Sequence, residues 1–175
     1  MINIFILVII IEVFLIFIFK NIKRMFPWLI NSKDLYPKFD PERFKKFKTQ
    51  KYNYYLGWDN KPNTESFDLL NGNKIFFKID RYGKRKTTSK KKSLIASFGD
   101  SYVFCRQNSD TNTWQENISR RNKFNISNYG VGNYGLDQSV LKYSKTKLDK
   151  NIKFVIQGFV PETISRIQSQ WKHFL

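Results

Sequence analysis

Cysteine and histidine are almost absent from this chain of 175 residues, which has one of each, Cys105 and His173. Disulfide frameworks, cysteine–histidine zinc sites and haem attachment all need several such side chains close together, so the sequence excludes them. We therefore expect neither a metal site nor a bound cofactor. Cys105 alone is best explained as a small buried residue.

Acidic residues are also scarce: 14 Asp and Glu stand against 31 Lys and Arg, a formal net charge of +17. Such a balance is typical of proteins that bind nucleic acid or an anionic membrane surface. Here Ile, Asn, Lys and Phe are abundant and alanine is rare along the whole chain, which indicates a general compositional bias. We do not expect nucleic acid as a partner on this evidence.

Apolar residues make up 41% of the chain and aromatic residues 17%. This content can bury a hydrophobic core, so the sequence excludes a mostly disordered chain. The length allows one domain with appendages.

The first part of the chain, residues 1–24, is predicted to be a membrane anchor with a basic flank. Residues 1–19 contain 16 Ile, Leu, Val or Phe residues, and as a helix they would be about 28 Å long. Glu12 costs about 2–3 kcal/mol on insertion, and the apolar residues return on the order of 5–9 kcal/mol. A cleaved signal peptide is the alternative, but no basic residue precedes the run and no small-residue cleavage site follows it.

Basic residues follow this segment at once, at Lys20, Lys23 and Arg24. By the positive-inside rule, a single-pass protein of this kind would place its globular part in the cytoplasm.

The second part, residues 25–92, is predicted to be an extended, basic lead-in with a short hairpin. Residues 74–80 have the composition of a strand, and Asn71-Gly72 is a hairpin turn signal that joins them to residues 67–70. Seven of the twelve residues from Arg81 to Lys92 are Lys or Arg. This run is either a solvated linker or a patch for lipid head groups or nucleic acid. A non-catalytic, membrane-tethered basic module that binds anionic lipid, glycan or RNA is therefore an alternative function.

The third part, residues 93–175, alternates strand and helix patterns. This order predicts an α/β domain with a parallel sheet and helices on both faces. Asp110 or Thr113 can cap the first helix, and Asp137 lies in the first turn of the second. The predicted strands are 93–98, 124–128 and 154–159, and the predicted helices begin at 113 and span 136–148.

Three polar or glycine-rich segments follow the three predicted strands: Asp100-Ser101, Gly130 to Gly135, and Glu162-Thr163. Ligands of parallel α/β sheets bind at this carboxyl edge. A Ser in a tight turn before a helix can present its hydroxyl to a substrate, with backbone N–H groups nearby to stabilise negative charge. Gly-Asp-Ser by itself also fits an ordinary strand-to-helix turn.

These segments resemble the conserved blocks of the SGNH (GDSL-type) hydrolases. Residues 95–102 (Ile-Ala-Ser-Phe-Gly-Asp-Ser-Tyr) are similar to the first block, and residues 128–138 (Asn-Tyr-Gly-Val-Gly-Asn-Tyr-Gly-Leu-Asp-Gln) are similar to the second. Thr113-Trp114 and residues 161–166 also fall at positions typical of the family. The resemblance implies an incomplete flavodoxin-like SGNH domain.

The resemblance implies a membrane-anchored esterase or O-acyltransferase that acts on an ester or acyl-bearing substrate, for which a glycan is one candidate. Ser101 would be the nucleophile, and its amide would be one oxyanion donor. Asn133 occupies the position of a donor glycine in the second block, where a positive φ would strain a residue other than glycine. Thr163 occupies the position of the third-block asparagine and would be a third donor.

The family's final block, which supplies an Asp and the histidine base, has no counterpart here. His173 is the only histidine, and Gln170 stands where the Asp would be expected. A serine without a base is a poor nucleophile. The resemblance therefore implies a truncated member that is inactive alone, unless a second polypeptide provides the base.

Gly130 to Gly135 also reads as G-x-G-x-x-G, which is typical of dinucleotide-binding loops after a strand. In those folds the loop follows the first strand, and an acidic residue ends the next one. Here it follows the second predicted strand, and residues 154–159 contain no acid. Dinucleotide binding is therefore the weaker alternative.

Overall fold

The computed structural model describes residues 2–25, 40–161, 163 and 167. Contacts divide these residues into two compact units, with residues 2–25 in the first and the other described residues in the second. The first unit contains helix α1 (Ile2–Met25). Its segment Ile4–Ile22 has a mean hydropathy of 2.7, and none of it is buried. By length and composition, α1 can cross a membrane, as the sequence predicts.

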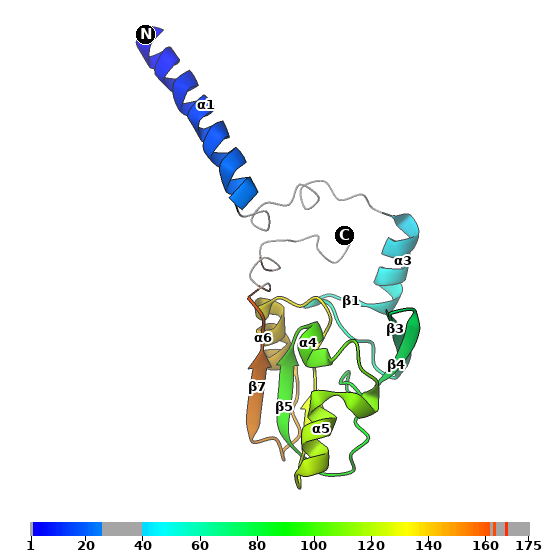
Figure 1. Cartoon of the computed structure of the whole chain (residues 1–175). Coiled ribbons are helices and arrows are strands. Elements are labelled where there is room, and N and C mark those ends of the chain that lie inside the picture. Colours follow the sequence, from blue (N-terminus) through cyan, green and yellow to red (C-terminus); the bar gives the residue numbers. More distant parts are fainter. Residues whose placement is uncertain (1, 26–39, 162, 164–166, 168–175) are drawn as a thin grey trace. The chain divides into compact units, whose positions relative to one another are not determined.

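The second unit is built on a parallel sheet of three strands (Figure 1). Its central strand is β5 (Ser93–Gly99), which pairs with β6 (Asn125–Asn128) on one side and β7 (Phe154–Gly158) on the other. All three strands lie where the sequence predicts them. Since they are parallel, their carboxyl ends lie at one edge of the sheet.

Helices cover both faces of this sheet. Successive side chains of β5 point to opposite faces, and two neighbouring residues of β5 contact different helices. Ser97 accepts a hydrogen bond from Gln115 of α5 (Trp114–Arg121) at 3.2 Å. Phe98 packs against Tyr143 of α6 (Leu136–Lys145), with ring centroids 5.5 Å apart. The protein is therefore a mixed α/β fold.

Both predicted helices are present, with small differences at their ends. Thr113 caps α5 by accepting a hydrogen bond from the Glu116 amide, while Asp110 begins a separate turn of 3₁₀ helix, η1 (Asp110–Asn112). Helix α6 ends at Lys145, three residues before the predicted end at Leu148. Leu148 packs against the buried cluster of Ala96, Phe98 and Tyr129 from the following loop, so its apolar character does not require a helix.

The predicted hairpin is confirmed as strands β3 (Thr64–Leu70) and β4 (Asn73–Ile79), which pair antiparallel. Asn71 and Gly72 have φ angles of +50° and +79°. Positive φ at both central residues is characteristic of a type I′ turn, for which Asn-Gly is the preferred pair. Helix α3 (Pro41–Gln50) and the short strands β1 (Tyr52–Asn53) and β2 (Gly57–Trp58) precede the hairpin.

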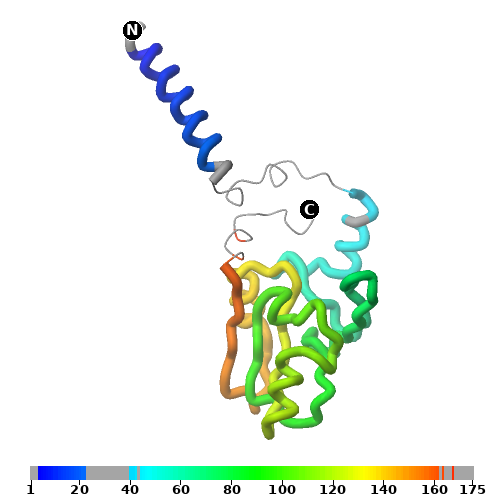
Figure 2. The backbone as a smooth tube through the Cα atoms, in the orientation of Figure 1, coloured from blue at the N-terminus to red at the C-terminus, as the bar shows by residue number. Residues whose placement is uncertain are grey.

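The described lead-in is not an extended appendage, because residues 40–92 pack into the same compact unit as the sheet. Leu56 forms a buried cluster with Val131 and Tyr134, and the Tyr134 hydroxyl donates to the Trp58 carbonyl at 2.7 Å. The position predicted as a domain boundary, between residues 92 and 93, therefore does not separate two units. Figure 2 shows the backbone of the described lead-in, residues 40–92, beside that of the sheet.

Arg85 links the lead-in to the sheet through both its backbone and its side chain. It is buried, and its backbone bridges Ile79 of β4 to Asn128 of β6. Its Nε donates to Asp110 at 2.8 Å, and its Nη1 donates to the carbonyls of Phe104 (2.6 Å) and Cys105 (2.8 Å). Its Nη2 donates to the Asn108 carbonyl. Arg85 thus joins the end of α4 and the start of η1 to the hairpin.

We predict that Arg85→Met lowers the free energy of unfolding by about 3 kcal/mol, because it leaves Asp110 and several buried carbonyls without their charged donor. Arg81→Met is the matched control: Arg81 is exposed, and the change should stay within about 0.5 kcal/mol. Urea denaturation of the full chain in detergent, followed by tryptophan fluorescence, measures both. Equal losses in the two variants would contradict the role given to Arg85.

Candidate active site

Ser101 is the first residue of a short helix, α4 (Ser101–Phe104), which begins directly after the central strand. The preceding Asp100 caps the helix, since its carboxylate accepts a hydrogen bond from the Tyr102 amide at 2.9 Å. Ser101 is half-buried. Among the described residues, neither its amide nor its hydroxyl has a hydrogen-bond partner. Both groups are therefore accessible to a ligand at the carboxyl edge of the sheet.

The other end of α4 turns sharply at Cys105, which has a left-handed φ of +58°. The Arg106 amide donates to the Ser101 carbonyl at 3.1 Å, and the Cys105 amide donates to the Tyr102 carbonyl at 3.2 Å. This pair of bonds is a Schellman motif, in which glycine is usual at the left-handed position. The turn brings Arg106 back beside Ser101.

Cys105 is buried, as the sequence predicts, and its thiol lies within 3.7 Å of the Gln115 side-chain oxygen. Burial raises the pKa of this thiol. The group therefore stays protonated at neutral pH, which fits a packing role better than a nucleophilic one.

Side chains from three distant segments hold the carbonyl groups of α4. Arg85 takes those of Phe104 and Cys105, as described above. The side-chain Nδ2 of Asn128 donates to the Val103 carbonyl at 3.0 Å, and the side-chain Nε2 of Gln115 donates to the same oxygen at 2.8 Å. A helix of one turn cannot satisfy its own last carbonyls, so these bonds fix α4 on the sheet.

The glycine-rich segment after β6 lies against the same helix. The Val131 amide donates to the Gly99 carbonyl at 3.0 Å. A Cβ atom on Gly130 would overlap the backbone nitrogen of Phe104, so only glycine allows this approach. From the lead-in, Asn60 donates to the Gly130 carbonyl at 3.0 Å, and the Trp58 indole donates to that of Gly132 at 3.1 Å.

Asn133 has a φ of +65°. A positive φ strains residues other than glycine, as expected from the sequence, and asparagine is the residue among them that tolerates it best. In the described part of the chain, the Asn133 amide has no hydrogen-bond partner, like that of Ser101. The assignment of both amides as oxyanion donors stays a prediction.

Thr163 is buried, and its hydroxyl donates to the Val160 carbonyl at 2.7 Å. A hydroxyl has one proton to donate, so Thr163 would have to release Val160 before it could bind an oxyanion. The other residues predicted near this strand end or as a base, Glu162, Gln170 and His173, lie outside the described residues.

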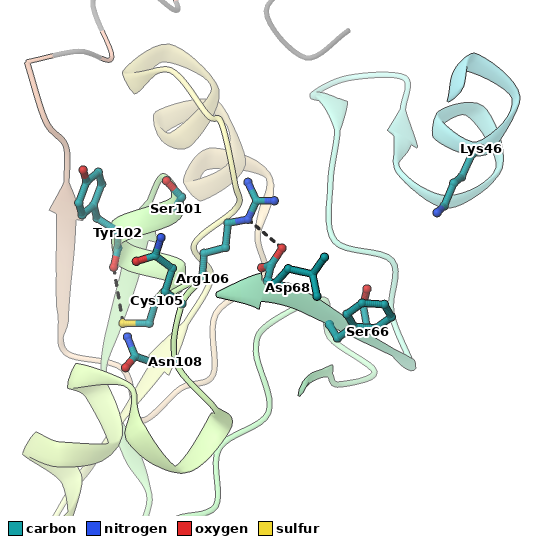
Figure 3. Close-up of a pocket in the computed structure, with 11 residues that line it drawn as sticks. Lys46, Ser66, Asp68, Ser101, Tyr102, Cys105, Arg106 and Asn108 are labelled. Carbon is teal, nitrogen blue, oxygen red and sulfur yellow. Dashed lines mark hydrogen bonds and ion pairs between the residues drawn. The ribbon is translucent and has the colours of Figure 1, made fainter. Parts of the chain in front are cut away.

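Described residues line a cavity at Ser101 and a smaller one at its neighbour Tyr102. The larger one has a volume of about 770 Å³ and is lined by Ser101, Arg106 and Asp68, among others (Figure 3). The smaller one, of about 360 Å³, is lined by Tyr102, Val103, Trp114, Phe159 and further residues. Tyr102 borders both. The sequence does not point to Arg106 or Asp68, because each lies outside a recognisable motif and they are 38 residues apart.

Some residues of the two alternative sites make contacts within the protein. The backbone of α4 occupies the space next to Gly130, and the Gly135 amide donates to the Gln138 side chain at 3.1 Å. This loop therefore has fewer free amides that could bind the pyrophosphate of a dinucleotide. In the basic run, Arg85 is buried and Lys91 donates to the carbonyls of Ser119 and Asn122 at 2.6 and 2.7 Å. Two of the seven cations of this run therefore hold parts of the fold together, whereas Arg81, Lys86, Lys90 and Lys92 are exposed.

The described residues contain no group of three or more His, Cys, Asp or Glu side chains that could hold a metal ion. In comparisons with known proteins, no protein-family model matches the chain, and a search of curated proteins returned no match.

The two glycines of the loop give a matched test of its contact with α4. Gly130→Ala should lower the free energy of unfolding by about 2 kcal/mol or more, because the new methyl group meets the helix backbone. Gly132→Ala meets nothing within 4 Å and should change it by less than about 1 kcal/mol. Thermal and urea denaturation compare the two. Equal stability of both variants would show that the loop does not lie against α4.

Proposed function

We propose that the protein is a membrane-anchored serine esterase or O-acyltransferase with a flavodoxin-like SGNH domain. The observation that carries the proposal is the position of Ser101: it begins a short, firmly held helix at the carboxyl end of the central strand, with no partner for its hydroxyl among the described residues. The sequence blocks at 95–102 and 128–138 support the same assignment. Helix α1 supplies the anchor, and the basic residues after it favour a cytoplasmic globular unit.

In the proposed reaction, the Ser101 oxygen attacks the ester carbonyl while a base takes the hydroxyl proton. The negative charge that develops on the carbonyl oxygen is stabilised by the amides of Ser101 and Asn133. The bond between the carbonyl carbon and the alcohol oxygen then breaks, the protonated base gives its proton to that oxygen, and an acyl group remains on Ser101. Transfer of this group to water completes a hydrolysis, and transfer to another hydroxyl completes an acyl transfer.

The base is the part of this reaction that no described residue supplies. An added imidazole can serve as an external base, because its ordinary pKa lies near neutrality. This allows the proposed nucleophile to be tested separately from its natural base.

We predict that a fluorophosphonate probe labels Ser101 in the full chain in detergent, and that the rate rises with imidazole concentration. Ser101→Ala should lose the label, with a rate at least about 100-fold lower, which is the range of a lost nucleophile. Ser144→Ala is the control, since Ser144 is an exposed serine on α6. Peptide mass spectrometry identifies the labelled residue. Equal labelling of Ser101→Ala and the control, or no labelling of any variant with imidazole present, would overturn the proposal.

A further inference from the structure

Arg106 lines the larger cavity together with Ser101, and only part of its guanidinium is hydrogen-bonded to described residues. Its Nε donates to Asp68 of β3 at 2.9 Å, and its side chain remains 52% exposed. The terminal N–H groups on Nη1 and Nη2 have no partner among the described residues. Figure 3 shows the guanidinium between Ser101 and Asp68. An arginine held in this way presents a fixed planar edge, which suits the two oxygens of a carboxylate.

Positive charge exceeds negative charge around this cavity. Lys46 and Arg106 line it, and Asp68 is the one acid among the described residues that do so. Lys51 lies close enough to interact electrostatically with both Asp68 and Arg106, and burial is the main cause of its lowered pKa. Its ammonium group makes no hydrogen bond or ion pair with any described residue. A bound anion would compensate these cations.

The remaining lining side chains are neutral hydrogen-bonding groups and aromatic rings. Ser66, Gln107 and Asn108 can pair with hydroxyl groups, and the residues Tyr102 and Phe67 are 65% and 44% exposed. Hydroxyl groups and apolar ring faces are both features of sugars. The volume of about 770 Å³ lies within the range of small-molecule sites.

We propose that this cavity binds an acidic saccharide, with a sugar carboxylate on Arg106 and Lys46 and the acylated part of the sugar next to Ser101. The role of Ser101 in this statement rests on the proposed function, whereas the saccharide site itself does not. Arg106 thereby determines specificity for a charged substrate. The Schellman turn at Cys105 fixes the spacing between the binding group and the reacting group, since it hydrogen-bonds the Arg106 amide to the Ser101 carbonyl.

The test uses tetragalacturonate, which carries carboxylates, and maltotetraose, a neutral oligosaccharide of the same length, in calorimetric titrations of the full chain in detergent. We expect the acidic sugar to bind at least tenfold more tightly than the neutral one, with an affinity that falls as salt is added. Arg106→Gln should weaken tetragalacturonate binding about tenfold or more. Arg121→Gln, which removes the same charge from an exposed position on α5 outside the cavity, should leave it unchanged.

Two further measurements separate the possible outcomes. The unmodified chain should bind tetragalacturonate whether or not the fluorophosphonate probe labels Ser101, so that failure of the hydrolase proposal leaves this result intact. Asp68→Asn keeps Arg106 and removes the competing carboxylate, so it should tighten binding even if Arg106→Gln fails to fold. The proposal is overturned by equal binding of the two sugars, or by equal effects of Arg106→Gln and Arg121→Gln. Displacement of tetragalacturonate by glycerol phosphate at an equal affinity would overturn the saccharide assignment and leave a simple anion site.

Discussion

The buried guanidinium of Arg85 is the interaction on which the rest of the second unit depends. A charge with so little access to water is stable only when nearly all of its donors are bound. Here the donors bind Asp110 and three carbonyls at the end of α4 and just after it, while the backbone of Arg85 joins β4 to β6. Arg85 therefore holds the β3–β4 hairpin, the turn after α4 and strand β6 together.

This arrangement gives the four residues of α4 two ends with different proposed tasks. The first end presents Ser101 at the carboxyl edge of β5, and the left-handed turn at the other end returns Arg106 to the same cavity. Side chains of Arg85, Asn128 and Gln115 hold the carbonyls between them. A short helix is stable here because distant segments complete its hydrogen bonds, and this rigidity is what a preorganised site requires.

Sequence patterns predict the parallel strands, the main helices, the hairpin turn and the apolar α1, because each has a local signal such as a hydrophobic run or an Asn-Gly pair. The packing of the lead-in has no such signal. Trp58, Asn60 and Arg85 act through hydrogen bonds to backbone carbonyls far away in the chain, and such bonds leave no periodicity. Helix α4 is too short to show a helical pattern, and the left-handed φ of Cys105 falls on a residue that rarely adopts it.

The most direct test of the account is an experimental structure of the chain with an alkyl boronate, which forms a tetrahedral adduct on a serine oxygen and mimics the proposed intermediate. We predict a bond between boron and the Ser101 oxygen, with one boronate oxygen accepting hydrogen bonds from the amides of both Ser101 and Asn133. A boronate bonded elsewhere, or an adduct on Ser101 whose oxygens face away from the Asn133 amide, would contradict it.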